Sequence, residues 1–159
     1  MTPSDAPSSD LVAVRKAAAA FGIDLTRRAQ AELEMYCYEL EGRATREGLM
    51  SERAVQRLDE HLIDSLSVCR ALGEVNVPAT CIDVGSGAGL PGIVVSIVRP
   101  DLTVTLLEPS ARRSRFLLEV SRNLPDGRLT LVTNRAELAA RGPLRESFDL
   151  AIARAVAPM

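Results

Sequence analysis

A glycine-rich segment constrains the fold of this chain more than any other feature. It reads Gly-Ser-Gly-Ala-Gly-Leu-Pro-Gly over residues 85–92, after the apolar run Thr80–Val84 and at the start of the helix-compatible stretch Pro91–Arg99. Glycines let the backbone turn sharply and approach a ligand closely, and Pro91 suits the first turn of a helix. A strand, a glycine turn and a helix in this order are typical of α/β folds that bind nucleotide-like ligands at the turn. An ordinary strand-to-helix turn is the alternative.

Strands and helices alternate along the second half of the chain. The patterns predict strands at Thr80–Val84, Thr103–Leu107, Leu129–Val132 and Phe148–Ala153, with helices at Pro91–Arg99 and Ala111–Asn123 between them. Such alternation favours parallel βαβ units and a doubly wound sheet. We therefore assign the chain to the α/β class, with the first four parallel strands of a Rossmann-like core over residues 79–159.

The first half of the chain has helical periodicity instead. Apolar residues recur every three to four positions from Leu11 to Gly22, from Thr26 to Gly42 and from Ser51 to Cys69, which predicts three helices. Ser9 or Asp10 can cap the first helix, the second starts near Thr26, and Ser51 opens the third. We expect a flexible, polar tail at 1–10 and a helical extension at 11–78.

Composition excludes several classes of protein. Apolar residues make up 47%, charged residues 25%, and the net charge is −2, which is typical of a globular protein and not of a highly basic nucleic-acid coat. The three cysteines are odd in number and form no Cys-x-x-Cys pair, which favours reduced thiols over disulfides. No stretch approaches the roughly 18 uncharged apolar residues of a membrane span. We expect a cytoplasmic protein that uses neither a membrane nor a metal.

Two acidic residues accompany the glycine turn. Asp83 precedes Gly85 by two positions, and Glu108 ends the next predicted strand 23 residues after Gly85. A carboxylate at that second place can accept hydrogen bonds from both hydroxyls of a ribose. Burying a carboxylate is unfavourable unless a partner satisfies it, so the pair indicates a polar ligand. For Glu108 the alternative is stabilisation by the dipole of the helix that follows.

The arrangement of the turn separates two ligand classes. A dinucleotide site needs a small residue at the third position of Gly-x-Gly-x-x-Gly, and Leu90 stands there, with the third glycine one residue earlier at Gly89. Asp-x-Gly-x-Gly-x-Gly followed by an acid such as Glu108 resembles class I S-adenosylmethionine-dependent methyltransferases. We favour the methyl donor as cofactor, and a NAD-binding oxidoreductase remains the alternative.

Several blocks together resemble the RsmG family (glucose-inhibited division protein B, GidB). These blocks are His61–Leu66, Asp83–Gly92, Glu108–Leu117, Arg135–Glu137 and Arg154–Ala157. The resemblance implies methylation of a guanine at N7 in 16S ribosomal RNA by a Rossmann-like core with an N-terminal helical extension. It implies S-adenosyl-L-methionine as cofactor and small-subunit ribosomal RNA, or the subunit itself, as partner.

The resemblance also implies which residues form the site. The expected donor-binding residues are Asp83, Gly85, Ser86, Gly87, Gly89, Leu90, Glu108, Ala136, Glu137 and Arg154. Arg154 would orient the substrate or the donor, with a surface arginine as the alternative. Arg112, Arg113 and Arg115 are candidates for RNA contacts, with a solvated helix face as the alternative. No acid–base catalyst is expected, because guanine N7 has a lone pair and no proton to remove.

Two further expectations concern a histidine–aspartate pair and the number of strands in the domain. His61 and Asp64 are three residues apart and can share a helix face, and we favour a hydrogen bond between them over catalysis. Class I methyltransferases have seven strands in the order 3-2-1-4-5-7-6, and four are predicted here. We therefore expect the C-terminal part of the domain to be missing, so that this form can be an inactive donor-binding module, and the full-length protein to be a monomer.

Overall fold

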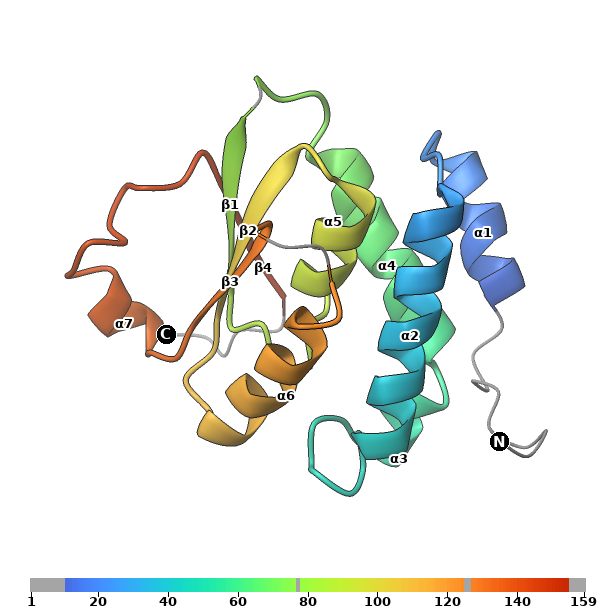
Figure 1. The fold of residues 1–159 in the computed structure, drawn as a ribbon, viewed down its shortest axis with the longest axis horizontal. Helices are drawn as coiled ribbons and strands as arrows, with labels where there is room; N and C mark the ends of the chain where they lie inside the picture. Colours follow the sequence, from blue (N-terminus) through green and yellow to red (C-terminus); the bar gives the residue numbers. More distant parts are fainter. Residues whose placement is uncertain (1–10, 77, 125–126, 155–159) are drawn as a thin grey trace.

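A four-stranded parallel sheet with strand order β3-β2-β1-β4 forms the centre of the fold (Figure 1). Its strands are β1 (Ala79–Val84), β2 (Leu102–Leu107), β3 (Leu129–Val132) and β4 (Leu150–Ala153). The structure is a computed structural model that describes residues 11–76, 78–124 and 127–154. β1 pairs in parallel with β2 and with β4, and β2 pairs in parallel with β3. The predicted α/β class and the first four strands of a Rossmann-like sheet are confirmed.

Helices cover the two faces of this sheet unequally. On one face lie α5 (Gly92–Val98) and α6 (Ala111–Ser121), and beside the other lies the short α7 (Ala136–Ala139), as Figure 1 shows. Every residue of α5 is buried, because the N-terminal helices pack over its outer side. The chain changes faces between β3 and β4, so the strand order reverses at β1. In sheets of this kind, ligands bind at the carboxyl ends of the strands beside that reversal.

The described part of the N-terminal extension, residues 11–76, contains four helices rather than the three predicted. They are α1 (Leu11–Ala20), α2 (Arg27–Arg43), α3 (Glu52–Val55) and α4 (Leu58–Ala71). The predicted helix starts at Thr26 and Ser51 are confirmed, and these two residues cap α2 and α3, since their side chains accept the N–H of Ala29 and Ala54. The third predicted helix is broken between α3 and α4, where Arg57 has non-helical φ and ψ of −118° and 30°. The predictions for residues 1–10 lie outside the described residues.

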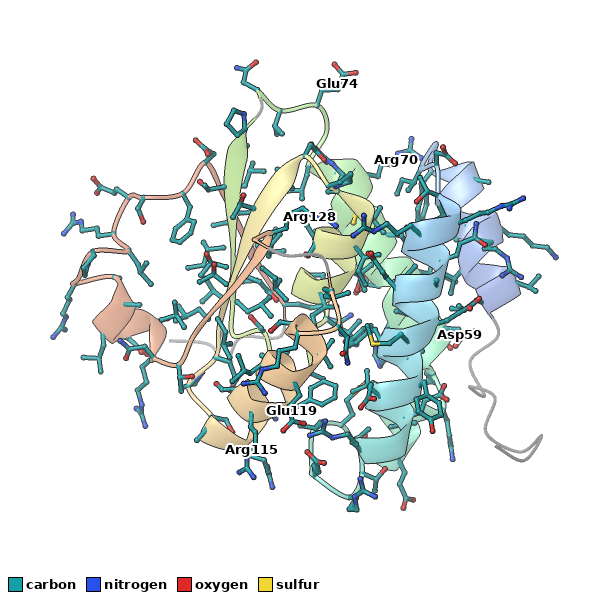
Figure 2. The ribbon with its side chains drawn as sticks, in the orientation of Figure 1. Asp59, Arg70, Glu74, Arg115, Glu119 and Arg128 are labelled. Carbon is teal, nitrogen blue, oxygen red and sulfur yellow. The ribbon has the colours of Figure 1, made fainter. Side chains whose placement is uncertain are left out.

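The extension and the sheet share one hydrophobic core. Its buried side chains come from α1, α2, α4, α5, α6 and the strands without interruption. At the far end of α2, the Arg43 guanidinium lies 2.5 Å from Glu119 on α6 and 5.0 Å from the centre of the Phe116 ring. Figure 2 labels Glu119 on α6, beside α2. The division at residues 78 and 79 stays a prediction, but the two segments are packed as one unit.

Buried thiols lie in both segments. Cys37, Cys69 and Cys81 are buried and form no disulfide. Burial raises the pKa of the Cys69 thiol to about 12 and that of the Cys81 thiol to about 11. Within the described ranges, no group of three or more His, Cys, Asp or Glu side chains is placed to bind a metal ion. No helix of the described residues has both the length and the apolar character to cross a membrane.

Candidate functional site

The glycine turn connects β1 to α5 at the carboxyl end of the sheet. The φ values of Gly85, Gly87 and Gly89 are 74°, 59° and 100°, which residues other than glycine rarely adopt. A Cβ on Gly87 would meet nothing closer than 3.8 Å, whereas a Cβ on Gly89 would overlap the Ile93 side chain. The first part of the turn is therefore open to a ligand, and Gly89 is needed for close packing of α5.

The Glu108 carboxylate connects the turn to the start of α6. The residue follows β2 directly and is only 2% exposed. Its Oε2 accepts the N–H of Gly87 at 2.8 Å, and its Oε1 accepts the N–H of Ser110 at 2.9 Å. Each carboxylate oxygen retains a second lone pair that can accept a further hydrogen bond. The position near the N-terminus of α6 also stabilises the negative charge, as the helix-dipole alternative proposed.

Asp83 is the least satisfied carboxylate among the described residues of the site. It is 1% exposed, and its Oδ2 accepts the N–H of Gly92 at 3.0 Å. Its Oδ1 has no hydrogen-bond partner. Burial raises the pKa of the Asp83 carboxyl from 3.8 to about 6, against the lowering effect of its hydrogen bonds. A buried acceptor without a partner is unfavourable, which makes Asp83 a candidate for contact with an ordered water or with a donor or cation of a ligand.

An open cavity of about 650 Å³ lies beside the turn, within the size range of small-molecule sites. Val84 and Leu107 give it apolar walls, and the polar side chains of Ser110 and Asn134 also line it. The remaining lining residues are Gly85, Pro109, Thr133, Arg135, Ala136, Glu137 and Leu138. Three of the predicted donor-binding residues, Gly85, Ala136 and Glu137, thus line one cavity. Glu108 is buried between two lining residues, Leu107 and Pro109.

Other predicted donor-binding residues face the protein interior. The Ser86 hydroxyl donates to the Asp83 backbone carbonyl at 2.9 Å, and Ser86 is 1% exposed. Leu90 is buried in the shared core with α5. The structure therefore separates residues that shape the turn, including Gly89, from those that line the cavity.

Arg154 contacts the helical extension. Its guanidinium Nη1 donates to the Asp64 carboxylate on α4 at 2.8 Å. This differs from the predicted hydrogen bond between His61 and Asp64, because among the described residues Asp64 pairs with an arginine 90 residues later. Burial lowers the pKa of His61, and the positive charge of Arg154 lowers it further. The ion pair places a cation where β4 ends.

The three candidate RNA-contacting arginines have different environments. Arg112 donates to the Gly48 carbonyl at 3.4 Å, which connects α6 to the loop after α2. The Arg113 guanidinium lies 3.9 Å from Glu108 Oε1. Arg115 is exposed and projects from α6, as Figure 2 shows. Their contact with RNA stays a prediction.

Some residues of the site were not predicted from the sequence. Thr133 and Asn134 line the cavity from the loop after β3. A polar loop at the carboxyl end of a predicted strand was the available signal for both. Ser110, another lining residue, also accepts the Arg113 N–H as the cap of α6. The hydroxyl of Tyr36 on α2 contacts the glycine turn at Ala88, and no local sequence pattern indicated this contact.

The chain is similar to one family of known proteins. The family described as rRNA small subunit methyltransferase G matches residues 29–159. A ribosomal RNA small subunit methyltransferase G from Mycolicibacterium paratuberculosis is 41% identical over 162 residues, covering 99% of this chain and 60% of the relative. The corresponding protein of Frankia casuarinae is 46% identical over 115 residues, covering 70% and 42%. That of Salinispora arenicola is 46% identical over 120 residues, covering 70% and 47%.

The identities and the coverages of these matches have two consequences. The chain spans about half the length of the curated relatives it matches. The match nevertheless covers the glycine turn, Glu108, the cavity and the four strands. The chain therefore belongs to the rRNA small subunit methyltransferase G family, whose core is a class I methyltransferase fold.

Proposed function

We propose that this chain binds S-adenosyl-L-methionine in the 650 Å³ cavity and that the protein transfers the methyl group to N7 of a guanine in 16S ribosomal RNA. The observation that carries the proposal is the combination, at the carboxyl ends of the neighbouring strands β1 and β2, of an open glycine turn, the buried Glu108 carboxylate and the unpartnered Asp83 oxygen. The proposed partner is small-subunit ribosomal RNA or the assembled subunit, with the protein acting as a monomer in the cytoplasm, where ribosomes are made.

The residues present fit the chemical parts of the donor. Asp83 Oδ1 lacks a partner and matches the positively charged ammonium of the methionine part. The remaining lone pairs of Glu108 match ribose hydroxyls. Val84 and Leu107 offer apolar surface to adenine, and Ala136 and Glu137 would flank it.

Positioning accounts for the proposed chemistry. When bound, the donor supplies a methyl group on a positively charged sulfur. Guanine N7 needs no general base, so the task of the chain is to hold the reactants in line, an effect that can contribute about 7–11 kcal/mol. Arg154, held by Asp64 where β4 ends, would orient the substrate or the donor.

Donor binding can be tested by calorimetric titration with S-adenosyl-L-methionine and, in parallel, with NAD. We expect heat from the methyl donor alone. Ala136→Phe should abolish it by filling the cavity, whereas Ala140→Phe, the same change one helical turn later and outside that cavity, should not. Binding of NAD in its place would contradict the proposal and favour the oxidoreductase.

Methyl transfer needs a separate experiment. The protein is incubated with donor carrying a tritiated methyl group and with deproteinised 16S RNA or small subunits. We expect label in 7-methylguanosine of 16S RNA. Donor binding without transfer to either substrate would contradict the proposed reaction and favour the alternative, a donor-binding module without activity.

A further inference from the structure

One residue of the helical extension reaches the glycine turn. Tyr36 lies on α2 with none of its surface exposed, and its hydroxyl donates to the carbonyl oxygen of Ala88 at 2.9 Å. The two residues are 52 positions apart in the sequence. Burial raises the pKa of the Tyr36 phenol well above its ordinary value, so the hydroxyl keeps its proton and remains a donor.

The peptide unit that joins Ala88 to Gly89 is held at both of its polar ends. Its carbonyl accepts the Tyr36 hydroxyl, and its N–H donates to the Ser86 carbonyl at 2.7 Å. Gly87 and Gly89, on either side of Ala88, have φ values of 59° and 100°. Because glycine adopts positive and negative φ with similar ease, sterics alone do not select this peptide orientation. Hydrogen bonds must do so, and of the two on this peptide the one from Tyr36 comes from outside the turn.

The orientation of this peptide affects the rest of the turn. Two residues closer to β1 than Gly89, the N–H of Gly87 is the one that Glu108 Oε2 accepts at 2.8 Å. A rotated peptide at Ala88 would change the direction of the Gly87 backbone and weaken that hydrogen bond. The Glu108 carboxylate would then no longer be fixed to the glycine turn.

We propose that Tyr36 is a positioning residue for the turn: its hydroxyl selects the Ala88 peptide orientation that keeps Gly87 on Glu108, which makes α2 part of the donor site. The identity of the ligand in this inference rests on the proposed function. The positioning of the turn does not, because it concerns the protein without ligand.

Tyr36→Phe removes the hydroxyl and leaves the ring, and Tyr38→Phe is the matched control on the exposed side of the same helix. In the ligand-free protein, we expect amide hydrogen exchange over residues 85–90 to become about tenfold faster in Tyr36→Phe and to stay unchanged in the control, as for the loss of one buried hydrogen bond. Val14→Ala, a core change in α1, should lower global stability without selectively accelerating exchange in the turn. Affinity for S-adenosyl-L-methionine should fall about tenfold in Tyr36→Phe only.

The outcomes separate the two proposals. Unchanged exchange in the turn of Tyr36→Phe overturns the positioning role, whether or not a donor binds. Faster exchange with unchanged donor affinity overturns the assignment of α2 to the donor site. Failure of the natural protein to bind the donor overturns the proposed function, while the exchange result still decides the positioning role.

A second readout serves if Tyr36→Phe does not fold. The chain contains two tyrosines and no tryptophan, so in Tyr38→Phe the ultraviolet absorption near 280 nm comes from Tyr36 alone. In the ligand-free protein, we expect that absorption to lie at longer wavelength than in the urea-unfolded chain, because the buried phenol donates a hydrogen bond to the turn. The same wavelength in both states would overturn the inference.

Discussion

Asp83→Asn should change the pH dependence of stability in a direction that the structure determines. Burial raises the pKa of the Asp83 carboxyl from 3.8 to about 6. Between those values the folded protein holds a proton at this site that the unfolded chain has released. Stability therefore falls as the pH rises through this window and remains lower above about pH 6. The difference in pKa corresponds to about 3 kcal/mol.

Urea unfolding of the natural protein and of Asp83→Asn, followed by circular dichroism from about pH 4 to 7, measures this effect. All other titrating groups are shared, so subtracting the two curves isolates Asp83. We expect the variant to gain about 2.4 kcal/mol relative to the natural protein across this range, which covers most of the full difference. Hydrogen bonds that asparagine loses or gains change the free energy of unfolding by the same amount at every pH. They therefore do not affect how the difference between the two proteins depends on pH.

A flat difference curve would refute the reasoning, because it would mean that the carboxyl has the same pKa in both states. Donor binding provides a second check. A cation beside Asp83 favours its charged form, so donor affinity of the natural protein should rise as the pH increases through about 6. Asp83→Asn should lose this dependence on pH.

Three further predictions concern the site and its supports. Glu108→Gln places an amide NH₂ against one of two backbone N–H groups, so it should lower stability by about 1–3 kcal/mol and weaken donor binding at least tenfold in calorimetry. In thermal unfolding, Gly92→Ala should destabilise by about 1–3 kcal/mol, because its Cβ would overlap the Asp83 carboxylate, whereas Gly42→Ala inside α2 should stabilise by about 0.5–1 kcal/mol. Asp64→Asn breaks an exposed ion pair and should change stability by less than about 1 kcal/mol, yet slow methyl transfer; an unchanged rate would argue against a role for the arginine after β4.

Local signals predicted much of the fold. The helix starts at Thr26 and Ser51 could be predicted because an N-cap depends on one side chain and an N–H three residues away. The strand at Leu129–Val132 was predicted with its observed bounds. Gly42 was expected to follow a helix but lies inside α2. Packing of the helix against the core outweighs the cost of about 1 kcal/mol that one glycine adds inside a helix.

The contacts that assemble the site could not be read from local sequence. Tyr36 meets the turn 52 residues later, and Asp64 meets Arg154 90 residues later. The helical periodicity from Thr26 to Gly42 does not indicate which carbonyl lies opposite Tyr36. The pairing of His61 with Asp64 was predicted from spacing alone, and a residue from the end of β4 takes that place instead.

The buried thiols offer a way to follow opening of the molecule. Only the thiolate is alkylated, and burial disfavours it at Cys69 and Cys81, so reagent reacts after exposure to water. Cys37 and Cys69 lie in the helices of the extension, and Cys81 lies in β1. If the continuous core unfolds as one cooperative unit, all three sulfurs become reactive at one common rate. Earlier labelling of the two helical thiols would instead show the extension detaching while the sheet stays closed.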